Sequence, residues 1–198
     1  RRLGVQRLNA LMKRGSAGTD TAYQAGPAAA NYVVSSRLYK EGKFRMVEVC
    51  IDLGGNGVDI VPGGSNDDAF HESGKTTAAN FLQWEDDLYG RFMYADTFIT
   101  EALASGGTPP TTVSIRKHTS AFAGAAGAGA GSDVLAGITA NAVGGMLSTR
   151  DWDAADNDQT DVDDGDYLHL THDNNSAADA MTGGRLVIRL FGVDNSWT

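Results

Sequence analysis

The sequence predicts a mainly β protein: a β-sandwich or jelly-roll-like barrel with an extended N-terminal arm and at most one or two short helices. About seven short segments alternate apolar and polar residues, as strands with one buried face do. The connections between them are rich in Gly and Asp, and Asp outnumbers Glu 20 to 5. Because Asp favours turns and caps over helix interiors, this bias also favours a loop-rich β fold.

The first 30 residues form the predicted arm and linker, and residues 31–198 form the predicted β-sandwich body. Residues 5–14 carry apolar side chains at helical spacing, followed by Gly15 as a C-cap. Three turns are too short to be stable alone in water. Two interpretations stay open here, a frayed tail or an arm that becomes ordered against a neighbouring subunit.

The body contains a series of predicted strands. The clearest is residues 44–53, with Val47, Val49 and Ile51 on one face, and the turn at 54–57 predicts a hairpin with residues 58–61. The last two segments look like a closing pair joined by a polar loop. The other predicted strands are residues 31–39, 91–103, 111–117, 167–171 and 185–193.

Two segments do not have a strand pattern. Residues 76–89 place Phe81, Trp84 and Leu88 at helical spacing and predict a second helix, although Leu82 and Trp84 also alternate. Residues 120–146 are rich in Gly and Ala, which bury little apolar area, so a long surface loop is expected there.

Charge is divided unevenly along the chain. Residues 1–45 carry nine Lys and Arg against two acids, a net charge of +7, whereas residues 46–198 carry seven against 23, a net charge of −16. A basic arm on an acidic body is suited to docking on another macromolecule. The predicted partner-binding residues are Arg1, Arg2, Arg7, Leu8, Leu11, Met12, Lys13 and Arg14.

Two classes of partner are disfavoured. Phosphates would repel the acidic body, and Tyr23 and Tyr32 are too sparse for a base-stacking platform, so nucleic acid is not the expected partner. No run of 18 apolar residues exists, so no membrane span is expected.

Residues 151–166 contain eight Asp, enough oxygen ligands for Ca²⁺. The spacing does not fit an EF-hand, and a solvated acidic loop is the simpler interpretation. No cofactor is therefore expected, with calcium as the open alternative. If an ion binds, the expected donors are Asp156, Asp158, Asp161 and Asp163.

Residues 69–76 fit a loose phosphate-loop pattern, with Lys75 and Thr76 at its end and Ala69 in place of the first Gly. Such a loop needs a buried strand before it and a helix after it, and the preceding strand signal stops at Pro62. A polar turn is the better interpretation. The alternative, a nucleotide-binding enzyme, stays open.

No catalytic group emerges from the remaining reactive residues. His169 and His172 are three apart in a predicted strand and so face opposite sides. Cys50 lies in a predicted strand with no adjacent base, which favours a packed core thiol over a nucleophile. No catalytic residues are predicted, and the chain is not expected to be an enzyme.

The C-terminal stretch, residues 165–171 and then 180–193 after a polar loop, resembles the closing hairpin of β-barrel structural proteins from tailed-phage virions. The Gly/Ala/Thr-rich loops and the extended arm are similar too. The resemblance covers about 40 residues. It implies a head decoration (cement) protein on the capsid surface, a homo-oligomer that docks its arm on the major capsid protein or other virion subunits.

Two other functions remain open. One is a small icosahedral virus coat protein, which also places a basic arm before a jelly roll. The other is a Ca²⁺-dependent carbohydrate- or surface-binding β-sandwich module that uses the loop at 151–166.

Overall fold

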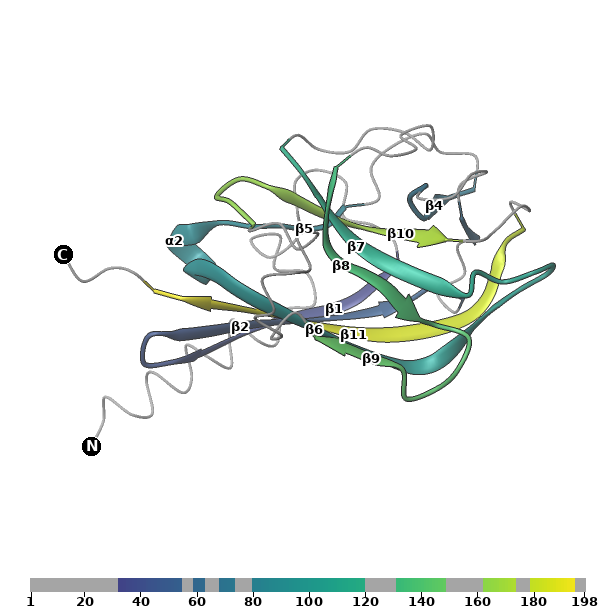
Figure 1. Ribbon diagram of the computed structural model, residues 1–198, viewed down its shortest axis with the longest axis horizontal. Helices are drawn as coiled ribbons and strands as arrows, with labels where there is room; N and C mark the ends of the chain where they lie inside the picture. Colours follow the sequence, from purple (N-terminus) through teal and green to yellow (C-terminus); the bar gives the residue numbers. More distant parts are fainter. Residues whose placement is uncertain are drawn as a thin grey trace.

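The protein is a two-layer β-sandwich, as predicted (Figure 1). The computed structural model describes residues 32–54, 59–62, 68–73, 80–119, 131–148, 162–173 and 179–194. One layer is a five-stranded sheet and the other a four-stranded sheet. A two-stranded ribbon and one short helix complete the described part of the chain.

The five-stranded sheet contains the longest strands and is antiparallel throughout. Its order is β1-β2-β11-β6-β9. The strands are β1 (Val33–Glu41), β2 (Phe44–Asp52), β11 (Met181–Val193), β6 (Arg91–Ser105) and β9 (Met146–Ser148).

The four-stranded sheet is also antiparallel and has the order β5-β10-β7-β8. Its strands are β5 (Asn80–Gln83), β10 (Tyr167–Asp173), β7 (Thr112–His118) and β8 (Ser132–Thr139). The ribbon pairs β3 (Ile60–Val61) with β4 (His71–Glu72), and α2 (Asp86–Tyr89) follows β5.

The strand order is that of a jelly roll. When β2 and the strands from β5 onward are taken in chain order, the first pairs with the last, the second with the seventh, the third with the sixth and the fourth with the fifth. These pairs are β2–β11, β5–β10, β6–β9 and β7–β8. A long hairpin wound into two sheets gives this pairing. The described residues therefore support the jelly-roll form of the predicted fold.

Alternating side chains from the two sheets form the core. Val47, Val49 and Ile51 of β2 are at most 2% exposed, and they face Leu168 and Leu170 of the other sheet. Each such side chain stabilises the fold by about 1.5–3 kcal/mol through burial. The aromatic residue before β1, Tyr32, also joins the layers, because its phenol reaches the backbone of Leu170. Burial raises the pKa of Tyr32 well above its usual range and keeps the phenol neutral.

Two predicted strand pairings are wrong. Residues 44–53 do not form a hairpin with 58–61, because β2 pairs with β1 and β11 while β3 pairs with β4. The last two strands are not a closing hairpin either: β10 and β11 lie in opposite sheets. The hairpin on which the resemblance to tailed-phage proteins depended is therefore absent.

Two predictions of non-strand structure are also wrong in part. The described portion of residues 76–89 is mostly strand β5, which pairs with β10, and only Asp86–Tyr89 is helical. Residues 120–146 are not one long loop, because β8 occupies Ser132–Thr139 and pairs with β7. In both segments a tertiary pairing overrides local composition.

Candidate functional site

Most of the predicted binding residues lie outside the described part of the chain. This is so for all eight residues of the predicted arm and for Asp156, Asp158 and Asp161. The fourth predicted metal donor, Asp163, is described. It lies in the turn at residues 162–166, which leads into β10.

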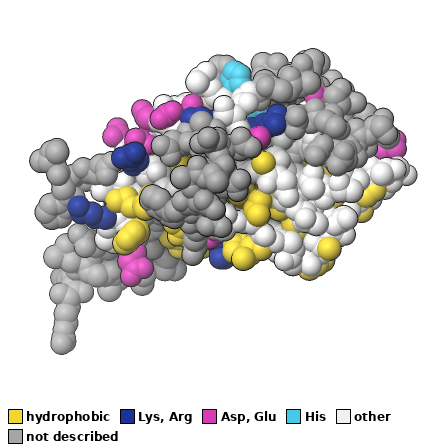
Figure 2. All heavy atoms as spheres, in the orientation of Figure 1, with side chains coloured by type: hydrophobic (Ala, Val, Ile, Leu, Met, Phe, Trp, Pro, Cys, Tyr) yellow, Lys and Arg dark blue, Asp and Glu magenta, His cyan; other side chains and the backbone are white. Residues whose placement is uncertain are grey.

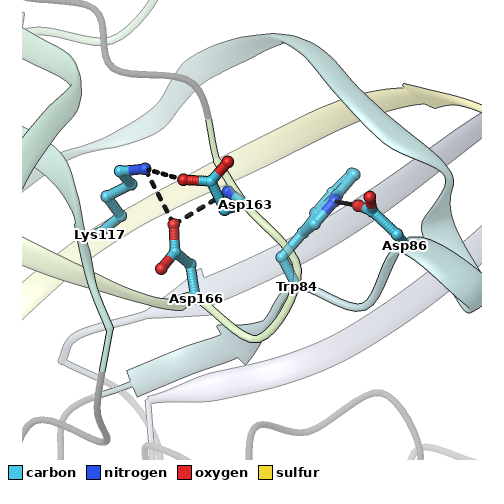
Figure 3. A network of polar contacts seen from close by, with 5 residues as sticks. All are labelled: Trp84, Asp86, Lys117, Asp163 and Asp166. Carbon is cyan, nitrogen blue, oxygen red and sulfur yellow. Dashed lines mark hydrogen bonds and ion pairs between the residues drawn. The ribbon is translucent and has the colours of Figure 1, made fainter.

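The carboxylate of Asp163 pairs with a protein cation. The Nζ atom of Lys117 lies 3.1 Å from Asp163 Oδ2 and 2.9 Å from Asp166 Oδ2 (Figure 3). Burial lowers the pKa of Lys117, but the two carboxylates raise it by more, so its net pKa is raised and the ammonium stays charged. Asp163 is 78% exposed whereas Asp166 is 4% exposed, so Asp166 depends most on this cation.

Backbone contacts hold the same turn against β5 and α2. Trp84 donates its backbone N–H to Asp166 O and accepts one from Gly165, both at 2.8 Å. The Trp84 indole donates to Asp86 Oδ1 at 3.0 Å, and the Asp86 N–H donates to Asp164 Oδ1 at 2.9 Å. We call this turn, residues 162–166, the clamp, because its contacts with β5 and α2 close one end of the sandwich. Among the described residues, no group of three or more His, Cys, Asp or Glu is placed to hold a metal ion.

The described part of the phosphate-loop pattern, residues 69–73, contains an isolated β-bridge and the short strand β4. Ala69 pairs with Thr171 of β10, and His71 and Glu72 form β4. The next described element is strand β5, where a phosphate loop would need a helix. Lys75 and Thr76 lie outside the described residues.

The two histidines of β10 point to opposite sides of the strand, as predicted, and both are 1% exposed. Burial lowers the pKa of His169 to about 3, with smaller contributions from His118 and Arg116. The ring of His172 instead lies edge-on to Phe70, with 5.4 Å between the ring centroids. The pair does not converge on one site.

Cys50 is not a core thiol, which corrects the prediction. In β2 the odd-numbered residues face the core, so Cys50 faces outward and is half-buried. It lines an open groove of about 520 Å³ together with Val34, Asp52, Thr100, Arg185 and Val187. The groove lies on the outer face of the five-stranded sheet.

This outer face is the candidate functional surface, and none of its residues was predicted to bind a partner. Two ion pairs cross from β11 to β2: Arg185 Nε lies 2.9 Å from Asp52 Oδ2, and Arg189 Nε lies 2.9 Å from Glu48 Oε2. Arg185 also lies 3.3 Å from Glu101 Oε2 of β6. We call the border between β2 and β11 the seam. Acids lie on its β2 side and bases on its β11 side.

Apolar and aromatic side chains flank these ion pairs on the same face. Tyr94 and Phe191 stack with ring centroids 4.2 Å apart, and the Arg189 guanidinium lies 5.1 Å from the centre of the Phe98 ring. Phe44 is 67% exposed and Met146 is 62% exposed at two borders of the face. Hydrophobic side chains are visible along the lower side of the molecule in Figure 2, where this sheet lies in Figure 1. An outer sheet face of this kind is suited to contact with another protein surface.

No protein-family model matches the chain, and no curated protein or solved structure matches it. Within the described ranges, no helix is long and apolar enough to cross a membrane.

Proposed function

We propose that the protein is a structural subunit of a virion, a coat protein whose jelly-roll body assembles with copies of itself into a shell. The observation that carries the proposal is the jelly-roll pairing of β2–β11, β5–β10, β6–β9 and β7–β8. Viral capsid domains use this architecture. Lectin domains and cupins use it too, so fold analogy alone does not distinguish these functions.

Two further features support an assembling subunit. Residues 1–30 carry a net charge of +4, five Lys and Arg against Asp20, whereas residues 31–198 carry a net charge of −13. Opposite charges on the two parts favour contact between the segment of one copy and the body of the next. The outer face of the five-stranded sheet also carries half-exposed aromatic and aliphatic side chains, which suit a contact between subunits.

The jelly roll favours a coat subunit over the decoration protein that the sequence analysis expected. A coat subunit assembles alone, whereas a decoration protein needs a preformed shell. The test is to purify the full chain and vary ionic strength and pH, with negative-stain electron microscopy and sedimentation velocity as readouts. We expect closed particles of uniform size.

A chain lacking residues 1–30 tests the role of the basic segment. We expect it to keep the circular-dichroism spectrum of the body but to form no uniform particles. If the full chain never assembles alone yet binds preformed shells, it is a decoration protein. If it does neither, the proposal of a virion subunit is wrong.

A further inference from the structure

We infer that the outer face of the five-stranded sheet binds the same face of a second copy, around a two-fold axis that runs parallel to the strands along the seam between β2 and β11. The inference rests on the proposed function for its setting, an assembly of many copies. Its geometry comes from the residues of the face itself.

The register of the sheet arranges the outward side chains in rows across the strands. From Val187 to Phe191, β11 pairs without a bulge with both β2 and β6. At the seam, two rows pair an acid on β2 with a base on β11, and three rows pair apolar or weakly polar side chains. The charged rows are Glu48 with Arg189 and Asp52 with Arg185, and the others are Phe44 with Val193, Met46 with Phe191 and Cys50 with Val187.

A two-fold rotation about the seam brings β2 of one copy over β11 of the other while keeping each row at its own level. Glu48 of one copy then faces Arg189 of the second copy, and Asp52 faces Arg185. In the uncharged rows, apolar or weakly polar side chains of one copy face the side chains of the same row in the second copy. Further out on the same rows, β1 comes over β6, so that Arg37 lies opposite Asp96 and Tyr39 lies opposite Tyr94. The face is therefore complementary to itself, as a two-fold interface requires.

The other two-fold arrangement is disfavoured by charge. An axis within the face but perpendicular to the strands would bring β2 over β2. If this axis lies on a charged row or midway between the two charged rows, it brings acids of β2 over acids and arginines of β11 over arginines. If it lies elsewhere, it brings charged rows over uncharged rows, and no charge meets an opposite charge across the contact. Like charges brought together in a desolvated contact are strongly unfavourable. The charge pattern thus selects the axis along the seam.

The size of the face is adequate for a specific contact. Four strands spaced by ~4.8 Å, with five outward positions spaced by ~6.8 Å along β2 and β11, give roughly 650 Å² per copy. The total of about 1,300 Å² reaches the range of specific protein interfaces. Arg185 and Arg189 are 58% and 40% exposed, and each already has a carboxylate partner in its own chain. Both arginines therefore keep a carboxylate partner when the contact buries them, and the large cost of burying an unpaired charge is avoided.

The first test measures mass against concentration for the full chain by sedimentation. We expect a species of twice the 20.8 kDa chain mass. Val187→Glu places an unpaired carboxylate at the centre of the contact and should weaken dimerisation at least tenfold. The matched control is Thr139→Glu, the same kind of charge change at an exposed position of β8 in the other sheet. It should dimerise like the wild type, and circular dichroism checks that both variants are folded.

The second test determines the direction of the axis by cross-linking in a Cys50→Ser background. Chains carrying Ser35→Cys are mixed with chains carrying Phe98→Cys and treated with a short bismaleimide. Across the seam axis these two positions face each other at the ~10 Å spacing of packed sheets, which the reagent spans. In the control, Ser35→Cys chains alone should not cross-link, because only the perpendicular axis brings two copies of residue 35 together.

Three results overturn the inference: a wild-type chain that stays monomeric, a Val187→Glu variant that dimerises like the wild type, or cross-linking of Ser35→Cys to itself instead of to Phe98→Cys. A monomer whose Cys50 is shielded from maleimide would mean that the same chain covers this face, which overturns it as well. Dimers without particles refute the proposed function alone. Particles formed equally well by Val187→Glu refute this inference alone.

Discussion

Two ion-pair systems, one in each layer of the sandwich, differ in how far their basic side chains are exposed to water. At the end of the four-stranded sheet, Lys117 binds Asp166, which is 4% exposed, inside a clamp of backbone and indole contacts. On the five-stranded sheet, Arg185 and Arg189 lie across the seam from their carboxylates and remain 58% and 40% exposed.

The difference separates charges that stabilise the folded chain from charges that stay exposed on the outer face of a sheet. The Lys117 cluster satisfies buried groups, so its loss leaves a carboxylate without compensation. In the seam pairs the carboxylates of Asp52 and Glu48 are mostly covered, at 9% and 15% exposed, but the arginines are open to water, so these pairs should contribute less to the stability of a single chain. Their regular arrangement is better explained by recognition than by stability. Four substitutions of graded effect test this contrast.

The largest effect is expected at Trp84, the side chain behind the clamp. Trp84 is fully buried, its ring lies 5.0 Å from Tyr89 and 5.3 Å from Phe92, and its indole donates to Asp86 and Gly90. Trp84→Ala should lower the free energy of unfolding by about 4 kcal/mol, because it leaves a large cavity. Denaturant unfolding measures this change.

Phe44→Ala is the control for this substitution, because Phe44 belongs to the other sheet and is 67% exposed. Its effect on the unfolding free energy of a single chain should stay below about 0.5 kcal/mol. Equal losses from the two variants would contradict the assignment of the clamp to the core and of Phe44 to the surface.

The next effect is expected from removal of the clamp cation. Lys117→Met leaves the buried carboxylate of Asp166 without its charge partner and should cost about 3 kcal/mol of unfolding free energy. Asp163 is the other carboxylate partner of Lys117 and is 78% exposed, so Asp163→Asn should cost less than about 1 kcal/mol of unfolding free energy. A comparison of the two denaturation midpoints tests whether burial sets the difference.

Acid should destabilise the four-stranded sheet through His169. Its pKa is about 3 in the folded chain against 6.5 for an unperturbed histidine, chiefly because it is buried. Between these two pKa values the unfolded chain binds a proton at His169 and the folded chain does not. The unfolding free energy is therefore full above pH 6.5 and falls as the pH is lowered from 6.5 toward 3. By pH 5 the loss is about 2 kcal/mol.

Unfolding free energies measured between pH 7 and pH 5 provide the test. His169→Gln should flatten the profile over this interval, whatever its stability at pH 7. A wild-type slope that survives in His169→Gln would assign the acid sensitivity to other groups.

The sequence predicted the faces of individual strands better than the way in which the strands pair. Alternation alone identified Val47, Val49 and Ile51 as core residues. The prediction of Cys50 as a core thiol was wrong because it did not follow the same alternation, which places Cys50 on the outer face. Pairing was not predictable in this way, because jelly-roll partners such as β5 and β10 lie far apart in the chain. Nothing local in residues 167–171 indicates which sheet the strand joins.

The candidate surface shows the same limit. Glu48 and Asp52 are four residues apart, and so are Arg185 and Arg189, which is the signal that the sequence contains. Four residues is a multiple of the two-residue strand period, so each pair shares a face. That the acids lie beside the bases follows only from the register of β2 with β11, which the sequence does not specify.

The smallest effect is expected at the seam itself. Arg189→Ala removes one ion pair and the contact with Phe98, but Arg189 is 40% exposed, so a single chain should lose at most about 1 kcal/mol. This loss should shrink at high salt, which screens exposed charges more than buried ones, whereas the loss from Lys117→Met should change less. Unfolding of dilute protein at low and high salt measures both, with Glu48→Gln as the matched change on the opposite strand. A loss at Arg189 that is as large and as salt-resistant as the loss at Lys117 would show that the seam stabilises the fold, and the contrast between the two systems would no longer hold.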